Sequence, residues 1–257
     1  MSWIPSYKKP GGGGGSVPSW STGTDEEIVA ALTAHYNGEI DLTEYWSVGD
    51  ERIVSLSAIT DTTYVTETQP AQDVTFVIVN IGGKELVTPI NGHTECAFVV
   101  GVKGLLYNTG VIYKTTPYND TGWYSSNRRN WCNNSFYNSI PSTLQPIFKM
   151  HNNYALNVYN ASSITKSEDY FCLPSGIELG VGGTSTDATY NTLFGYYETS
   201  ANRLKMREGE ASSSSYWTST KMWSSSKNYQ MLLVSPDGIS SSGRDNTSLG
   251  ISPQGVI

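Results

Sequence analysis

Two short runs rich in β-branched and apolar residues, 74–81 and 96–102, constrain the fold of this chain most. Runs of this length and composition predict buried strands. Further strands are expected at residues 52–59, 84–87, 216–220, 229–234 and 239–243. Gly82 and Gly83 offer a two-residue turn, so residues 74–81 and 84–87 are expected to pair as a hairpin. Ser235-Pro236-Asp237-Gly238 predicts another tight turn, because proline presets φ and glycine accepts a positive φ.

Helices are predicted at three places. Thr24 and Glu27 have capping-box spacing, and Asn37-Gly38 supplies a left-handed stop. The inward stripe of this first helix is expected to be Ile28, Leu32 and Tyr36. A second helix is expected over residues 125–138, capped by Ser125 or Ser126 and turning inward Trp131, Cys132 and Phe136. Pro141 fits the first turn of a third helix, whose apolar residues are Leu144, Ile147 and Phe148. Pro146 must kink or split this helix.

Residues 1–21 hold Pro5, Pro10, Pro18 and the glycine run at 11–15, a composition that cannot bury enough apolar area to fold alone. We therefore expect a tether over residues 1–21 that makes few contacts with its own domain. A capped helix and connector over 22–45 and one recognition domain over 46–257 follow it. Two small domains would fit the length equally well. Apolar residues before the glycines leave open a docking peptide for a virion partner.

Charged residues make up 15% of the chain, against about 25% in an average globular protein. The chain instead has 17 Tyr and 7 Trp beside only 6 Phe. Tyr and Trp, combined with Ser, Asn and Gly, form the mixture that binding surfaces use. The formal net charge of −7 argues against nucleic acid and anionic membrane as partners, because both require clustered Lys and Arg.

The three cysteines, Cys96, Cys132 and Cys172, are widely spaced and odd in number. We therefore expect free thiols, with Cys96 packing as a small apolar side chain. No secretory signal and no apolar stretch long enough to span a membrane is evident. The expectation is synthesis in the cytoplasm without a signal peptide and action on a virion or an extracellular surface, without membrane insertion.

Two sequence blocks are specific enough to suggest relatives: Trp46-Ser47-Val48-Gly49-Asp50 and Arg128-Arg129-Asn130-Trp131-Cys132-Asn133. They resemble an uncharacterised domain family common in phages and gut Firmicutes, whose later blocks resemble residues 169–175, 216–220 and 250–253. The chain is also similar to the formylglycine-generating-enzyme-like branch of the C-type-lectin folds, which includes hypervariable receptor-binding tip proteins of phages. No cysteine follows Cys172, so the late cysteine pair of those enzymes is missing and their catalysis is not implied.

The resemblance covers residues 46–257. It implies an α+β, C-type-lectin-like domain with small, mostly antiparallel sheets, two or three helices and abundant loops.

The richest candidate for a contact surface is the serine-rich segment 212–229, which also carries aromatic residues. Antiparallel pairing of residues 229–234 with 239–243 would bring Tyr229 beside Arg244. The predicted ligand face therefore consists of Trp223, Ser225, Tyr229, Arg244, Asp245 and Asn246. Such a platform suits stacking on a sugar ring or anchoring in a protein pocket. A low-complexity, solvated loop is the structural alternative.

No catalytic residue, metal site or cofactor is predicted. His93-x-x-Cys96 offers two ligands where a structural zinc needs four, and no cysteine has a family-type nucleophile signature beside it. Calcium stays open as an alternative, although the loop signature is missing around its candidate ligands Asp237, Asp245 and Asn246. Arg128 and Arg129 are expected to pair with nearby carboxylates or carbonyls rather than to clamp an anion.

Together these features predict a non-catalytic binding protein, on a phage tail or fibre tip or as a surface-displayed adhesin. Its expected ligand is a host-cell surface carbohydrate or protein. A structural virion subunit, such as a baseplate or fibre adaptor without ligand binding, is the alternative. Whether the chain forms a homo-oligomer is left open.

Overall fold

The computed structural model describes residues 16–65, 68–106, 122–156, 164–183, 187–206, 215–222, 230–238, 240–244 and 251–257. Within these ranges the fold is mixed α+β, and each named strand pair is antiparallel. The α+β class with antiparallel sheets, expected from the sequence, is confirmed.

The described strands form three sheets. The largest has the order β1 (Glu51–Leu56), β2 (Gln72–Ile81), β5 (Phe98–Val102), β12 (Gln254–Val256) and β8 (Phe171–Cys172). A second has the order β4 (His93–Glu95), β3 (Glu85–Ile90), β6 (His151–Leu156) and β7 (Ile164–Asp169). The third has the order β11 (Ser240–Arg244), β10 (Gln230–Val234) and β9 (Tyr216–Met222).

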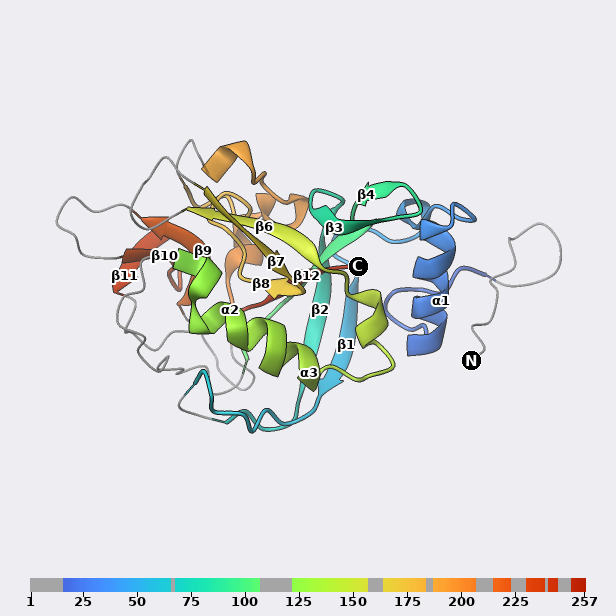
Figure 1. The fold of residues 1–257 in the computed structure, drawn as a ribbon, viewed down its shortest axis with the longest axis horizontal. Coiled ribbons are helices and arrows are strands. Elements are labelled where there is room, and N and C mark those ends of the chain that lie inside the picture. The colour runs from blue at the N-terminus through green and yellow to red at the C-terminus, as the bar shows by residue number, and fades with distance from the viewer. Residues whose placement is uncertain are drawn as a thin grey trace.

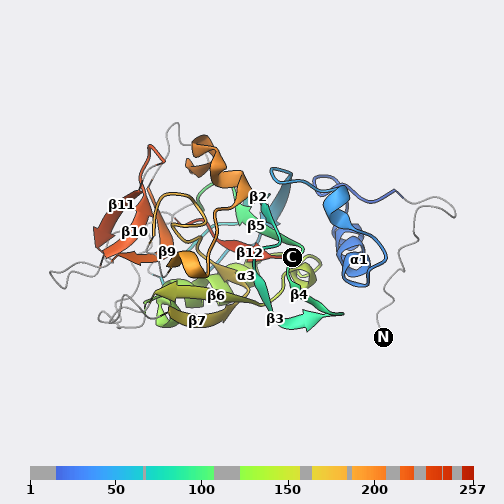
Figure 2. The ribbon, with the colours of Figure 1, turned by 90° about the horizontal axis from the view of Figure 1, so that it is seen from above.

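The helices are short and lie around these sheets. They are α1 (Asp25–Tyr36), α2 (Asn127–Trp131), the π-helical turn η3 (Cys132–Phe136) and α3 (Tyr137–Ser139). The 3-10 turns are η1 (Leu42–Glu44), η2 (Gly122–Ser125), η4 (Gln145–Ile147), η5 (Asp187–Thr189), η6 (Gly195–Glu198) and η7 (Ser200–Arg203). Helix α1 and the three-stranded sheet lie at opposite ends of the long axis (Figures 1 and 2).

The predicted first helix is confirmed together with both of its ends. Thr24 accepts a hydrogen bond from the backbone N–H of Glu27, and the Glu27 side chain accepts one from the N–H of Thr24. This reciprocal bonding satisfies two N–H groups that a helix start otherwise leaves unpaired. Gly38 has a φ of +72°, the left-handed conformation that glycine adopts without cost.

The predicted second helix is confirmed as the continuous run α2, η3 and α3. Ser126 is its N-cap and accepts a hydrogen bond from the N–H of Arg129. The inward residues are the expected ones, since Trp131, Cys132 and Phe136 are all fully buried. At Pro146 the chain forms only the 3-10 turn η4, because a proline inside a helix removes a donor and clashes with the preceding turn.

The predicted hairpin between residues 74–81 and 84–87 is wrong. Gly82 and Gly83 do adopt positive φ angles, of +63° and +86°. The turn nevertheless carries the chain from one sheet into another, because β1 and β5 occupy both edges of β2. Strand β3 pairs instead with β4 and β6.

The predicted tether extends too far along the chain. Residues 1–15 lie outside the described residues, but Trp20 is 1% exposed and packs against Trp46. The carbonyl of Pro18 accepts a hydrogen bond from Nε1 of Trp46, and the carbonyl of Trp20 accepts one from Arg52. The apolar area and hydrogen bonds of Pro18 and Trp20 therefore fix this end of the segment to the domain.

One hydrophobic cluster connects α1 to the sheets, and it includes Ile28 and Leu32 of that helix. The C-terminal strand β12 lies inside this core, between β5 and β8 (Figure 1). The Tyr36 hydroxyl donates a hydrogen bond to the carbonyl of Ile257, so α1 is also fastened to the end of β12. Within the described residues, no helix is both long and apolar enough to cross a bilayer.

Candidate functional site

The three-stranded sheet brings together the chain positions that flank the predicted ligand face. Gln230 of β10 lies opposite Arg244 of β11 on one side and opposite Met222 of β9 on the other. The Gly238 N–H donates to the carbonyl of Ser235, which confirms the turn between β10 and β11. The predicted antiparallel pairing of these strands is thus confirmed, and three strand ends meet at the end of the molecule far from α1 (Figure 1).

Most predicted contact residues lie outside the described residues. Trp223, Ser225, Tyr229, Asp245 and Asn246 all fall there, and of Arg244 only the backbone is described. In the sequence, Trp223 follows Met222 and Tyr229 precedes Gln230. The ligand face therefore stays a prediction.

A second feature of the same half of the molecule is a stacked pair of tyrosines, of which Tyr190 is exposed and Tyr154 is half-buried. The Tyr154 ring on β6 stacks on that of Tyr190, with centroids 4.8 Å apart, and Tyr190 is 49% exposed. Oε2 of Glu85 accepts hydrogen bonds from the Tyr154 hydroxyl at 2.7 Å and from Nδ2 of Asn152 at 2.6 Å. Strand β6 contacts β9, so this stack lies next to the three-stranded sheet.

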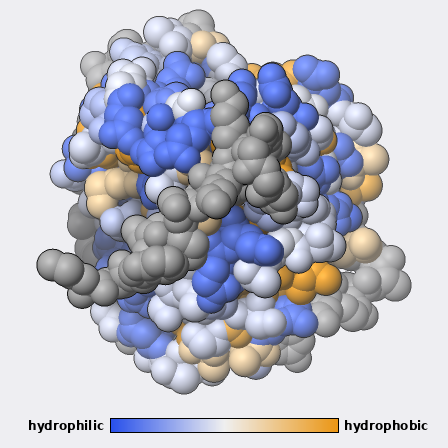
Figure 3. Space-filling view, turned by 90° about the vertical axis from the view of Figure 1, so that its right-hand side faces the viewer, coloured by the Kyte–Doolittle hydropathy of each residue, from blue (hydrophilic) through white to orange (hydrophobic). Residues whose placement is uncertain are grey.

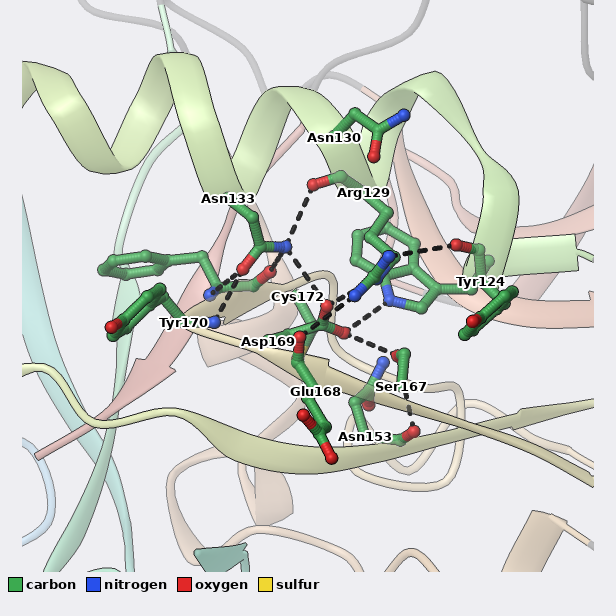
Figure 4. A network of polar contacts seen from close by, with 12 residues as sticks. Tyr124, Arg129, Asn130, Asn133, Asn153, Ser167, Glu168, Asp169, Tyr170 and Cys172 are labelled. Carbon is green, nitrogen blue, oxygen red and sulfur yellow. Dashed lines mark hydrogen bonds and ion pairs between the residues drawn. The ribbon is translucent and has the colours of Figure 1, made fainter. Parts of the chain in front are cut away.

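Two of the sequence blocks named above, residues 128–133 and 169–175, meet at the buried carboxylate of Asp169 (Figure 4). Asp169 accepts hydrogen bonds from Nε1 of Trp123 at 2.8 Å, Nε of Arg129 at 2.6 Å and Oγ of Ser167 at 2.7 Å. Asn133 adds a fourth donor at 3.2 Å and also accepts from the N–H groups of residues 170 and 171. This network fastens helix α2 and turn η3 to strands β7 and β8.

The chemistry of this network is structural. Arg129 pairs with the Asp169 carboxylate and with the carbonyls of Tyr124 and Glu168. Such pairing with nearby carboxylates or carbonyls is the one expected from the sequence. Asp169 is fully buried, and four side chains of the protein donate hydrogen bonds to it. A buried charge that is bonded in this way holds elements in place.

A second buried cluster surrounds Glu178, in the long excursion between β8 and η5. Its carboxylate forms an ion pair with Lys84 and accepts hydrogen bonds from Nε2 of Gln254 at 2.8 Å and from the N–H of Ser175 at 2.7 Å. Burial by itself lowers the pKa of Lys84, but the Glu178 carboxylate outweighs it, and the net shift is upward. Lys84 is therefore held as an ammonium.

Cys172 and His151 extend this cluster. Sγ of Cys172 lies 3.5 Å from Nε2 of His151 and 3.7 Å from Nε2 of Gln254. Burial raises the pKa of Cys172 to about 12 and lowers that of His151 to about 3. Both groups are therefore neutral, and the expected free thiols are confirmed for Cys96, Cys132 and Cys172.

Sequence reasoning foresaw that Arg129 pairs with a carboxylate or carbonyls but not that Asp169 is its partner, and it missed the Glu178 cluster entirely. Lys84, Glu178 and Gln254 are far apart in the chain, and no spacing rule connects them. Among the described residues, no group of three His, Cys, Asp or Glu side chains is arranged to hold a metal ion. Figure 3 shows the α1 end as a mainly hydrophilic surface, with hydrophobic residues scattered over the part that is visible.

Comparison with known proteins gives one family. No curated protein and no solved structure matches the chain. A family model described as "Domain of unknown function (DUF6273)" matches residues 102–255. The match spans the Asp169 network, the excursion that carries Glu178 and the three-stranded sheet. Because it covers more than half of the sequence, this chain belongs to that family, the domain of unknown function DUF6273.

Proposed function

We propose that this chain is a non-catalytic recognition protein with a C-type-lectin-like fold. In this proposal it is displayed on a phage tail or fibre tip or on a bacterial surface, and it binds a host-cell carbohydrate or protein. The observation that carries the proposal is the register of the three-stranded sheet. Met222, Gln230 and Arg244 are neighbours in that sheet. In the sequence, the residues of the predicted ligand face directly adjoin these three strand ends.

The position of these strand ends in the molecule supports the proposal that the protein displays its ligand face outward. The first described residues and α1 lie at one end of the long axis, and β9, β10 and β11 lie at the other (Figures 1 and 2). A protein attached through its N-terminal segment would then present the strand ends outward. The C-type-lectin-like assignment rests on the sequence resemblance together with the α+β class.

The exposed tyrosine stack supports a carbohydrate as the ligand. An exposed tyrosine face gives a flat apolar surface for a sugar ring, and carboxylate and amide groups bind hydroxyls. Tyr190 offers such a face, and the Glu85 carboxylate accepts a hydrogen bond from the hydroxyl of Tyr154, on which Tyr190 stacks.

The test is binding of the labelled full-length chain to intact bacterial cells and to an array of bacterial surface glycans. Trp223→Ala and Tyr229→Ala are expected to weaken binding about tenfold or more, as truncation of an aromatic hot spot does. Tyr45→Ala is the matched control, since Tyr45 is also exposed but directly follows η1, which contacts α1. If both variants bind like the parent, the structural virion subunit becomes the leading hypothesis.

A further inference from the structure

In the tyrosine stack, the polar groups lie at the level of the inner ring, that of Tyr154. Oε2 of Glu85 accepts hydrogen bonds from the Tyr154 hydroxyl and from Nδ2 of Asn152. Asn152 is 3% exposed whereas Glu85 is exposed, so a buried amide holds a solvent-facing carboxylate at the edge of the inner ring. These hydrogen bonds lower the pKa of Glu85, the one from Tyr154 most, and the group is an anion at neutral pH. Among the described residues, none donates a hydrogen bond to its second oxygen, Oε1.

The outer ring, that of Tyr190, covers the face of Tyr154 without using these polar groups. The two ring planes are 22° apart, with centroids separated by 4.8 Å. Within the described part of the chain, no hydrogen bond involves the Tyr190 hydroxyl, and the residue is 49% exposed. Rotation about χ1 would therefore carry the Tyr190 ring into solvent and uncover Tyr154, and it need not move the backbone.

An aromatic face with a carboxylate at its edge suits a sugar ring. The apolar face of a pyranose packs on the aromatic ring, and hydroxyls at its periphery donate to the carboxylate. To reach Glu85, the sugar must lie directly on Tyr154, because a sugar on the outer face of Tyr190 would be one ring further from the carboxylate. Tyr190 therefore occupies the place that such a sugar would take.

We propose that Tyr154 and Glu85 form a subsite for one neutral hexopyranose unit of a glycan, and that Tyr190 is a plug which the sugar displaces. The inference rests on the proposed recognition function and adds to it the class of sugar and a self-blocking contact. It uses none of the residues of the predicted ligand face. Strand β6 contacts β9, so a glycan chain held at Tyr154 could extend toward that face.

A cationic ligand fits this subsite less well. Lys166 is the direct partner of Tyr154 in the pairing of β6 with β7, so its side chain projects from the same face of the sheet. It is exposed, and its ammonium group contributes to the lowered pKa of Glu85, so a positive charge already stands near the carboxylate. This charge would repel a second cation, and a single aromatic face does not enclose an ammonium group. A neutral sugar is not repelled and can accept a hydrogen bond from Lys166.

Saturation-transfer NMR on the full-length chain, with the methyl glycosides of glucose, galactose and mannose as probes, tests the subsite. The parent is expected to bind at least one of them with a Kd of about 1 mM or weaker, because the contact is small. Tyr190→Ala should lower that Kd about threefold to tenfold, because the sugar no longer has to displace a stacked ring. Glu85→Gln should raise it about tenfold, because the sugar loses a charged acceptor.

Tyr124→Ala is the matched control. Tyr124 is 47% exposed and, like Tyr190, has one ring face covered, in this case by the Arg129 guanidinium. Its replacement should leave the Kd unchanged. Tyr190→Phe keeps the stacked ring and should bind like the parent. Tyr190→Gln empties the same position and takes the place of Tyr190→Ala if the alanine variant does not fold.

Three results would overturn the inference. Weaker or unchanged binding by Tyr190→Ala would show that Tyr190 itself is the platform or that the sugar binds elsewhere. Binding of choline in place of every hexoside would assign the subsite to an ammonium ligand. Absence of hexoside binding in both the parent and Tyr190→Ala would remove the subsite. None of these results decides the proposed function, which depends on binding to intact cells and on its loss in Trp223→Ala and Tyr229→Ala.

Discussion

Asp169 accepts a hydrogen bond from Nε of Arg129 at 2.6 Å, and this contact fastens strand β7 to helix α2. Trp123, Ser167 and Asn133 donate to the same fully buried carboxylate. Asp169→Ala would leave these donors buried without their acceptor. We expect it to lower the free energy of unfolding by about 3–5 kcal/mol, measured by urea denaturation.

Glu168→Ala is the matched control for this prediction. Glu168 is the preceding residue on β7, its side chain is exposed, and its carbonyl rather than its carboxylate accepts from Arg129. The expected change is within about 0.5 kcal/mol. Equal losses for the two variants would contradict the role given to Asp169.

His151 should make the protein less stable in acid. Burial lowers its pKa in the folded protein to about 3, from the ordinary value of 6.5. The unfolded chain therefore takes up the proton first. The stabilisation is complete above pH 6.5 and is lost progressively toward pH 3, by about 1.4 kcal/mol for each pH unit.

Urea denaturation at pH 7, 6 and 5 measures this dependence. The His151→Gln variant carries no titrating ring, so its stability should fall less steeply between pH 6 and 5 than that of the parent. Parallel curves for the two proteins would show that His151 is not the cause.

A histidine pair joins α1 to the hairpin of β3 and β4. The rings of His35 and His93 have centroids 5.7 Å apart, and Nδ1 of His35 accepts the N–H of Leu42 at 3.2 Å. Burial lowers the pKa of His35, His93 lowers it further, and Asp41 opposes the shift. Protonation would remove the acceptor for Leu42 and place a cation in a half-buried site.

The folded pKa of His35 lies below its ordinary value, so this contribution to stability is present above pH 6.5 and is lost as the pH falls through the folded pKa. Hydrogen exchange in the last turn of α1, corrected for the intrinsic rate, should therefore be less protected at pH 5 than at pH 7. Replacement of His93 by Gln should reduce the difference. Unchanged protection in the parent across this range would refute the prediction.

Gly255 is expected to tolerate no side chain. A Cβ there would lie 2.7 Å from Cε1 of Phe171 and 2.8 Å from the carbonyl oxygen of Tyr170. Gly255→Ala should therefore cost about 1–3 kcal/mol or more, as overpacking of a core does. Gly101→Ala is the control in the neighbouring strand, because its new Cβ would come no closer than 3.4 Å to any atom. Thermal unfolding should show a clearly larger loss for Gly255→Ala.

The sequence by itself determined the local features of this protein. The capped helix that starts at Thr24, the helix that starts at Ser126 and the turn at residues 235–238 were all predictable. Each depends on hydrogen bonds and φ preferences within a few residues, and these preferences are visible in a single stretch of sequence. The pairing of β10 with β11 followed from that turn.

Only the tertiary structure decided which distant residues meet. The partner of β3 depended on β2 having both edges occupied, and the burial of Trp20 depended on Trp46 and Arg52. The contact of Cys172 with Gln254 spans 82 residues and arises because the last strand enters the sheet beside β8. Such contacts depend on packing and strand order across the whole chain, which no local pattern of residue types encodes.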